Sequence, residues 1–150
     1  MHIAIQRDIG AHLHTVPAVQ IDAAGATATT ANGAAFNRLT GANDLFLSCK
    51  VVLQVVGGVD TTAGTLVWNM QHSVEGTTWV DFGDKDGSTV QTATVTTGSD
   101  AVSAADFDLS SARQFIRVQA AVNKVTTSSS ESIHIGGAIV LGGGDENPAD

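Results

Sequence analysis

Apolar residues alternate with other residues along several stretches of the chain, with the period of two that marks one face of a β-strand. In the firmest stretch, from Leu45 to Val56, every odd-numbered side chain is apolar, whereas the even-numbered ones are mixed. A wholly apolar face opposite a mixed face is typical of a sheet that is covered on one side only. The stretch therefore predicts a long strand of a packed sheet.

A second alternating pair predicts a β-hairpin. Leu66–His72 places Leu66, Trp68 and Met70 on one face, and Thr77–Phe82 returns after a turn at residues 73–76. Asn32-Gly33 is a further hairpin signal, and it leads into residues 34–39. Other strands are expected at residues 18–21, 89–96, 101–108, 115–122 and 132–141, with a single helical turn within residues 108–113.

Short strands at this spacing predict an all-β protein built as a single β-sandwich, either Ig-like or jelly-roll-like. The absence of Tyr and the content of 16 Gly and two Pro do not alter this interpretation, and abundant Val and Thr favour it. We expect three parts: an extended N-terminal arm over residues 1–17, a β-sandwich domain over residues 18–142, and a flexible acidic C-terminal tail over residues 143–150.

Charge and targeting signals narrow the function classes. The formal net charge is −8 with only seven Lys and Arg, which are scattered, so direct nucleic-acid binding is disfavoured. We find no secretory signal and no apolar run of membrane-spanning length, which favours synthesis in the cytoplasm and no membrane contact. The single cysteine, Cys49, cannot form an internal disulfide and is expected to be a small buried hydrophobe.

No catalytic, cofactor or metal constellation is recognisable. His12 and His14 would share one face of a strand, but no third ligand follows nearby. The segment Asp81–Gly87 resembles part of a calcium loop without its bidentate Glu, so an Asp-rich and Gly-rich turn is expected there. Ser128–Ser130 lacks a nucleophile elbow, and Gly142–Gly144 has no helix after it to bind phosphate.

The two tryptophans are expected on paired strands of the predicted hairpin, where they would pack across the strands. Trp68 shares its face with Leu66 and Met70, which favours the core. Trp79 lies among Thr77 and Asp81, so its burial stays open.

The segment Leu66–Phe82, with its His72-Ser-Val-Glu-Gly-Thr-Thr-Trp79 turn, resembles a hairpin common in small structural proteins of tailed bacteriophages. The Asn32–Thr40 segment followed by a long apolar strand is similar to those proteins too, so the resemblance covers roughly residues 22–82. Many such proteins are head decoration (cement) proteins. The resemblance implies a β-sandwich that grips the major capsid protein on the outer capsid surface of the virion, and it implies no catalytic residue.

The expected partner is therefore the major capsid protein, and a homo-oligomer such as a trimer would suit a three-fold capsid junction. The arm offers Ile3, Ile5, Ile9 and Leu13 as apolar anchors for capsid binding. Two alternatives stay open: another virion component, such as a tail-tube or head-completion subunit, and a carbohydrate-binding module that uses Trp79 and the Asp84–Gly87 loop.

Overall fold

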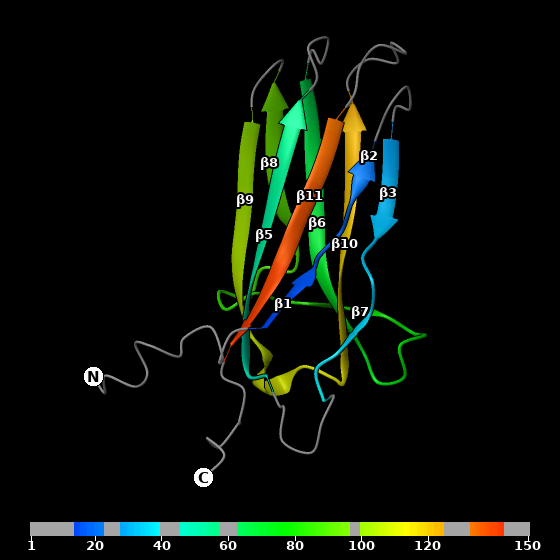
Figure 1. Ribbon diagram of the computed structural model, residues 1–150, viewed down its shortest axis with the longest axis vertical. Coiled ribbons are helices and arrows are strands. Elements are labelled where there is room, and N and C mark those ends of the chain that lie inside the picture. Colours follow the sequence, from blue (N-terminus) through cyan, green and yellow to red (C-terminus); the bar gives the residue numbers. More distant parts are fainter. Residues whose placement is uncertain are drawn as a thin grey trace, which may run out of the picture.

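The computed structural model describes residues 14–22, 28–39, 46–57, 63–96, 100–124 and 133–142, which form two layers of strands (Figure 1). The elements in these ranges are β1 (His14–Pro17), β2 (Ile21–Asp22), β3 (Ala28–Asn32), β4 (Phe36–Asn37), β5 (Ser48–Gly57), β6 (Ala63–Ser73), β7 (Val80–Phe82), β8 (Gln91–Thr96), β9 (Asp100–Asp108), the 3-10 turn η1 (Leu109–Ser111), β10 (Phe115–Lys124) and β11 (Ile133–Gly142). The all-β prediction is confirmed. No helix in these ranges is long and apolar enough to cross a membrane.

The strands form two antiparallel sheets. Sheet A has the order β1-β11-β5-β9, and β2 continues the β1 edge by pairing further along β11. Sheet B has the order β3-β10-β6-β7, in which β4 extends the β3 edge and β8 shares the other side of β6 with β7.

Three pairs of short strands each share one neighbour: β1 and β2 pair with β11, β3 and β4 with β10, and β7 and β8 with β6. If each of these pairs is counted as one strand position, each sheet of the described chain has four positions. Numbered along the chain, these positions run 1-8-3-6 in sheet A and 2-7-4-5 in sheet B. Successive segments therefore cross repeatedly between the sheets, which is the double Greek key of a jelly roll. Of the two sandwich types expected, the topology selects the jelly roll.

The core lies between the sheets and follows the predicted alternation. In β5 the side chains of Cys49, Val51, Leu53 and Val55 are buried, although Leu47 precedes the strand and is exposed. Trp68 is fully buried on β6, and its indole N–H donates a hydrogen bond of 2.8 Å to Ser103 Oγ on β9 of the facing sheet. A buried indole needs such a partner, so this bond also fixes how the two sheets face each other.

The predicted hairpin is confirmed in outline, since β7 pairs with β6 in the register Met70 to Phe82. The prediction that the two tryptophans lie on paired strands and pack against each other is wrong. Trp79 precedes β7, and the partners of Trp68 on either side are Ala120 and Gln91. The loop takes up more residues than the sequence suggested, so Trp79 never reaches the ladder.

The prediction of a hairpin at Asn32-Gly33 is also wrong. β3 and β4 do not pair with each other but pair with successive parts of the same strand, β10. The dipeptide interrupts one edge strand instead. Gly33 N–H donates to Val118 O at 2.8 Å, and a Cβ on Gly33 would lie 1.7 Å from Ala18 O. Glycine is required here because the edges of the two sheets meet at this point.

The predicted arm and the strand after it also need correction. Residues 14–17 form β1, in register with β11 from His14 opposite Leu141 to Pro17 opposite Ala138, so they belong to the sandwich. The short strand expected at Ala18–Ile21 begins only at Ile21. Proline suits β1 because an edge strand leaves its outer side unpaired.

Candidate functional site: the outer face of sheet A

The solvent-facing side of sheet A, called the A face below, is an open surface made of regular structure. Its residues form five rows across the strands, set by the pairing register. The rows, from β1 or β2 through β11 and β5 to β9, are Gly142–Ser48–Asp108 without a first member, Thr15–Val140–Lys50–Asp106, Pro17–Ala138–Val52–Ala104, then Gly136–Gln54–Val102 without a first member, and Asp22–His134–Val56–Asp100. Most of these side chains are small or apolar.

Apolar groups are exposed at the centre of the A face. Val102 is 68% exposed, the highest value among the large hydrophobic residues of the described chain, and Val56 is 36% exposed. The row through Pro17, Ala138, Val52 and Ala104 has no polar side chain. A contiguous apolar patch of this kind marks an interaction site more often than isolated exposed residues do.

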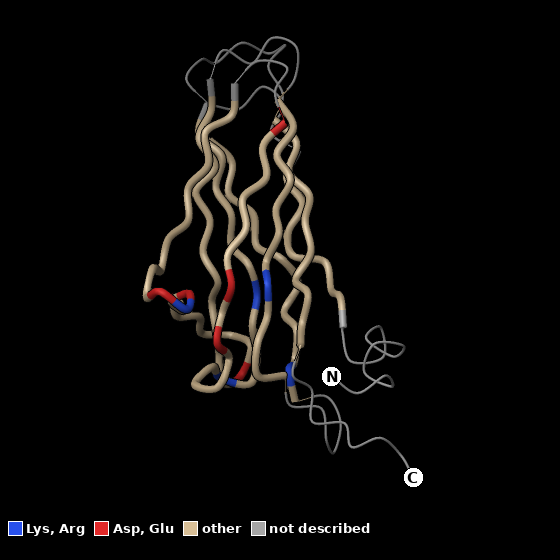
Figure 2. The backbone as a smooth tube through the Cα atoms, turned by 90° about the vertical axis from the view of Figure 1, so that its left-hand side faces the viewer, with Lys and Arg blue, Asp and Glu red and all other residues tan. Residues whose placement is uncertain are grey.

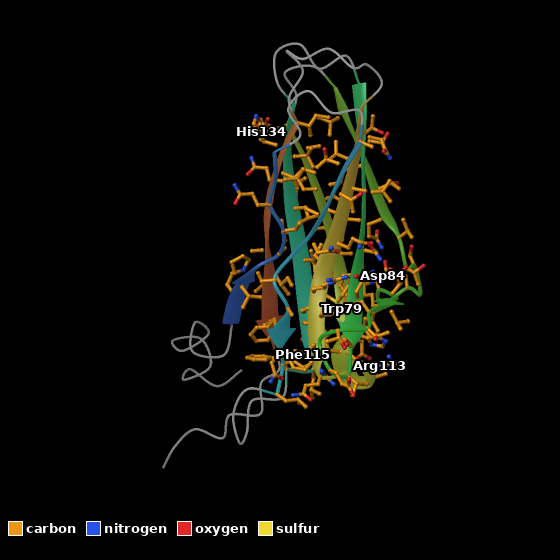
Figure 3. The ribbon with its side chains drawn as sticks, turned by 90° about the vertical axis from the view of Figure 1, so that its right-hand side faces the viewer. Trp79, Asp84, Arg113, Phe115 and His134 are labelled. Atoms are coloured by element: carbon orange, nitrogen blue, oxygen red, sulfur yellow. The ribbon has the colours of Figure 1, made fainter. Side chains whose placement is uncertain are left out.

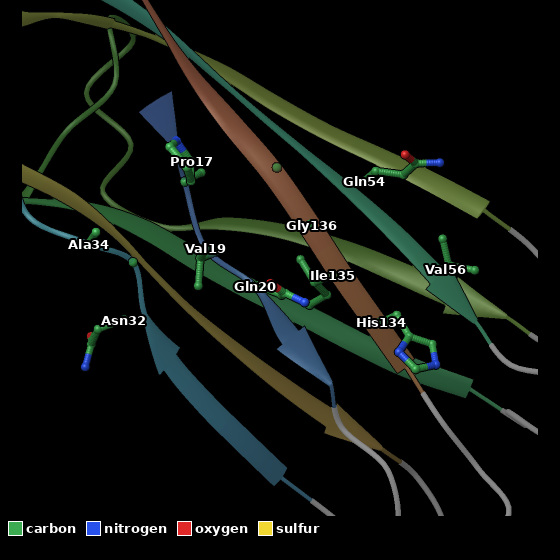
Figure 4. A pocket seen from close by; sticks show the side chains of 13 residues that line it. Pro17, Val19, Gln20, Asn32, Ala34, Gln54, Val56, His134, Ile135 and Gly136 are labelled. Atoms are coloured by element: carbon green, nitrogen blue, oxygen red, sulfur yellow. The ribbon is translucent and has the colours of Figure 1, made fainter. Parts of the chain in front are cut away.

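A hollow of about 530 Å³ opens at the β11 side of the A face and extends round the sheet edge towards β3. Its floor includes Gly136, where an added Cβ would meet no atom within 4 Å. Figure 4 shows Gly136 on β11, with Pro17 on one side and Gln54 and Val56 on the other. The hollow exists because Gly136 faces outward and leaves the backbone bare between larger neighbours.

The charges on the A face lie towards its two ends, with Asp22 and Asp100 in the row at one end and Lys50 and Asp106 near the other. Lys50 Nζ is 3.1 Å from Asp106 Oδ1, and the two half-exposed side chains neutralise each other. In Figure 2, Lys, Arg, Asp and Glu gather in the lower half of the sandwich, while the upper half is almost free of them. The centre of the A face therefore carries no net charge.

The outer face of sheet B is polar by contrast. The Arg117 guanidinium carbon lies 4.2 Å from the centre of the Trp79 ring, and Arg117 Nε donates to Gln71 Oε1 at 2.9 Å. Gln71 in turn donates to Asp81 Oδ1 at 3.0 Å, as does the Asn69 amide. Arg117 thus covers one face of the half-buried Trp79, and the polar groups satisfy one another.

The Asp84 loop is an internally bonded turn. Asp84 Oδ1 accepts hydrogen bonds from Ser88 N–H at 2.8 Å and from Asp86 N–H at 3.0 Å, and Oδ2 accepts one from Gln91 at 2.7 Å. Burial raises the pKa of the Asp84 carboxyl, but these hydrogen bonds outweigh it and hold the pKa below its usual value. Both carboxylate oxygens therefore serve to shape the loop.

The histidines among the described residues do not come together. His134 lies on the A face near the end opposite Trp79 and Asp84 (Figure 3), whereas His72 packs against Phe82 in a tilted arrangement with ring centres 4.9 Å apart. His14 is in β1, and His2 and His12 lie outside the described residues. In the part of the chain that the structure describes, no three His, Cys, Asp or Glu side chains are grouped as metal ligands.

The predicted capsid-binding residues Ile3, Ile5, Ile9 and Leu13 lie outside the described residues, as does the acidic tail after Gly142. Sequence reasoning did not identify the A face. The mixed even-numbered side of Leu45–Val56 was its only signal, because the rest of the face depends on the register of strands that are distant in sequence.

The topology defines a jelly-roll β-sandwich with one open sheet face. No protein-family model matches the chain, and no curated protein matches it. Among solved structures, it is similar to the PBSX exported protein XepA, with 14% identity and a TM-score of 0.53 over 91% of this chain and 39% of that one.

Two structures of infectious bursal disease virus are similar to the same extent. The VP2 subviral particle has 13% identity and a TM-score of 0.54 over 90% of this chain and 33% of that one. The Gx strain structure has 15% identity and a TM-score of 0.52 over 91% of this chain and 34% of that one. The chain thus spans between a third and two fifths of these relatives, and the likeness is one of fold.

Proposed function

We propose that the protein is a structural component of a phage virion, a decoration or cement protein that binds the outer surface of the major capsid protein shell and stabilises the head. One observation carries the proposal: the domain leaves the centre of one sheet face apolar and open, while its polar clusters are engaged in bonding one another. Surface of this kind contributes binding energy through contact, not through chemistry.

The similarity in fold to known virus-derived structures agrees with this proposal. One of the similar structures is a viral shell assembly, the VP2 subviral particle, and another is an exported protein of PBSX. Fold by itself does not decide function, so the open face remains the main support.

The N-terminal segment is proposed as a second contact. Residues 1–13 precede β1, whose first residue, His14, pairs with Leu141 at one end of the sandwich. Thirteen residues reach up to about 45 Å when extended, far enough to contact a neighbouring subunit. Ile3, Ile5, Ile9 and Leu13 would supply the apolar side chains, and linking this contact to that of the domain raises affinity through effective concentration.

Binding to phage heads that lack the protein tests the proposal. Wild-type protein is expected to decorate the heads, seen by electron microscopy, and to raise their disruption temperature. A chain lacking residues 2–13 is expected to decorate them less while unfolding at the same temperature as the wild type. The deletion stops at residue 13 because β1 begins at His14.

Failure of the wild-type protein to bind any head preparation would overturn the proposal. Two other results would replace it: rings of the purified protein that stack end to end would indicate a tail-tube or head-completion subunit, and glycan binding abolished by Trp79→Ala would indicate a carbohydrate-binding module. Arg117 already covers one face of Trp79, which leaves less of the ring for a sugar.

A further inference from the structure

One edge of sheet A is left unpaired in the described chain. The sheet ends at β9, and no described strand pairs with the outer side of β9, the strand at the left of Figure 1. Proteins usually protect such an edge, because its free N–H and C=O groups bind a further strand readily. The opposite edge shows this protection, since β1 and β2 are short and β1 contains Pro17. β9 has nine residues with no proline and no lysine, so it is the edge better suited to accept a strand.

Hydrogen bonds near the end of β9 show which of its residues face outward. Just after the strand, Leu109 N–H donates to Leu47 O at 2.8 Å, so the odd-numbered residues bond to β5. The even-numbered residues therefore direct their N–H and C=O groups away from the sheet. Asp106 O accepts a bond of 2.9 Å from Lys85 N–H on that side. The loop of Lys85 thus covers the edge at Asp106 and leaves residues 100–104 without a described partner there.

The core beside this open stretch is lined by small side chains. Ala101 and Ser103 of β9 point inward, because they pair with buried residues of β5, yet both are partly exposed. β8 lies next to β9 across the sandwich, and its inward-facing Ala93 is partly exposed as well. A strand added beside β9 would bring every second side chain over these small residues, and it would leave the A face open.

We propose that residues 2–6 of a second copy of this chain add to β9 as an antiparallel strand, in the register that places Ile3 opposite Ser103. Ile5 then lies opposite Ala101, and both isoleucines cover the small residues at the edge of the core. Antiparallel order continues that of sheet A and is slightly more stable per residue than parallel order. The added strand specifies which neighbouring subunit the N-terminal segment contacts, and so rests on the N-terminal contact proposed above.

Charge favours this segment as the added strand. Arg7 is the only Lys, Arg, Asp or Glu among residues 1–7, and the register brings it next to Asp100 at the start of β9. The other carboxylates of β9 lie beyond the paired stretch, where Asp106 is neutralised by Lys50 and Asp108 ends the strand. The added segment thus carries a positive charge to an acidic edge.

The connection between the two copies keeps their acidic domains apart. Each chain has a net charge of −8, so broad contact between two domains is opposed by repulsion. Residues 7–13 separate the added strand from β1 and span up to about 25 Å, more than the roughly 8 Å over which salt screens charges. Arg7 and Asp8 are the only Lys, Arg, Asp or Glu of this connection, and their charges cancel.

The geometry requires a second copy rather than the chain's own edge. His14 lies in the same row of sheet A as Phe107, since the register links the two through Leu141 and Cys49. In the proposed register residue 6 lies beside Asp100, seven residues along β9 from that row and four strand spacings from β1, or about 30 Å from His14. Eight residues reach at most about 29 Å in a straight line, and a path over the sheet is longer. A contact from each copy to the next closes into a ring, and the trimer expected above is one such ring.

A disulfide between two variants tests the register. Ala4 lies opposite Val102 in the proposed pairing, within the distance that a disulfide spans. Full-length Ala4→Cys and tagged Val102→Cys chains, mixed at about 0.1 mM and mildly oxidised, are expected to give a mixed dimer of distinct mass. In the control, Thr65→Cys on the outer face of sheet B replaces Val102→Cys and is expected to give none. Cys49 adds no background, since burial and, to a lesser extent, Asp106 raise the pKa of its thiol to about 12.

Proline substitutions test whether the main chain makes the contact. Val102→Pro removes an N–H that points away from the sheet, which an edge strand tolerates, and Ala4→Pro removes the opposing donor ahead of β1. Analytical ultracentrifugation of the wild type is expected to give a mass above the 15.3 kDa of one chain, and each proline is expected to weaken association by about tenfold or more. The matched controls Val102→Ala and Ala4→Val keep the N–H groups and are expected to associate as the wild type does.

Three results would overturn the strand exchange. They are no mixed dimer between Ala4→Cys and Val102→Cys, a loss of association in Val102→Ala as large as that in Val102→Pro, and a disulfide that forms only within single chains carrying both cysteines. Head binding is judged separately. If the wild type decorates heads although no strand is exchanged, the capsid proposal stands and the N-terminal segment contacts the shell. If strands are exchanged but no head is bound, the exchange stands and the capsid proposal fails.

Discussion

At the scale of single residues, two adjacent glycines of β11 face opposite sides of sheet A and differ in what they tolerate. A Cβ on Gly137 would lie 2.4 Å from Leu53 Cδ2 and 2.4 Å from Val52 O, whereas one on Gly136 would meet nothing within 4 Å. We predict that Gly137→Ala costs about 1–3 kcal/mol of unfolding free energy through overpacking. Gly136→Ala is expected to be neutral or to stabilise the strand by up to about 1 kcal/mol. Urea denaturation of both variants measures this, and equal losses would contradict it.

His72 makes stability depend on pH. Burial lowers the pKa of its imidazole below the usual 6.5, and the charges of Arg113 and Arg38 lower it further. Because the unfolded chain then binds a proton more readily than the folded one, this contribution to stability is full above pH 6.5 and is lost as the pH falls through the folded-state pKa.

We therefore predict that the unfolding free energy of the wild type declines as the pH is lowered from about 7 to about 5, a range set by the histidine. His72→Gln, which does not titrate, should decline less steeply over the same range. Denaturant titrations at several pH values compare the two, and parallel curves would show that His72 does not couple folding to protons.

At the scale of elements, Arg38 joins the segment after β4 to the connection between η1 and β10. Its side chain is 6% exposed and donates from Nε to Arg113 O at 2.9 Å, from Nη1 to Phe46 O at 2.9 Å, and from Nη2 to Ala112 O. Sequence reasoning counted Arg38 only as one of the scattered cations. Two of these carbonyls belong to the η1–β10 connection and the third to the segment before β5, so their convergence leaves no local signal in the sequence.

Arg38→Ala is predicted to cost about 2–4 kcal/mol, because it leaves buried carbonyl groups without donors. The control is Arg113→Ala, which removes an exposed side chain but keeps the backbone carbonyl that Arg38 uses. Thermal and denaturant unfolding should separate the two variants clearly. A loss in Arg38→Ala no larger than that in the control would mean that water replaces the guanidinium without cost.

The elements also show what the sequence can predict. β5, β6, β10 and β11 were predicted because a long strand buried on one face needs a sustained alternation, and Ile116, Val118 and Ala120 follow it to full burial. The pairing of β3 and β4 was predicted wrongly, since a turn dipeptide such as Asn32-Gly33 marks a hairpin only if its flanks pair with each other, and here both pair with β10. The A face lay beyond prediction because Gly136, Gln54 and Val102 become neighbours only through register.

At the scale of the whole molecule, the jelly roll makes the end of the described chain essential to its beginning. β11 lies inside sheet A, where it pairs with β5 along its whole length and with β1 and β2 on its other side. Ile133, Ile135, Ile139 and Leu141 of this strand are all buried in the core. No part of sheet A except the β5–β9 pair can form before β11 is in place, so folding depends on contacts distant in sequence.

We predict that a chain ending at Ser132 does not unfold cooperatively, since it leaves the edges of β5 and β1 unpaired and loses one of the two inner strands of the sheet. A chain ending at Gly142 is expected to unfold at the wild-type temperature, because it keeps all of β11. Near-UV circular dichroism reports the packing of Trp68, which loses its defined environment only in the shorter chain. A cooperative transition in the Ser132 truncation would mean that sheet B and the β5–β9 pair form a stable unit alone, and that the fold does not depend on β11.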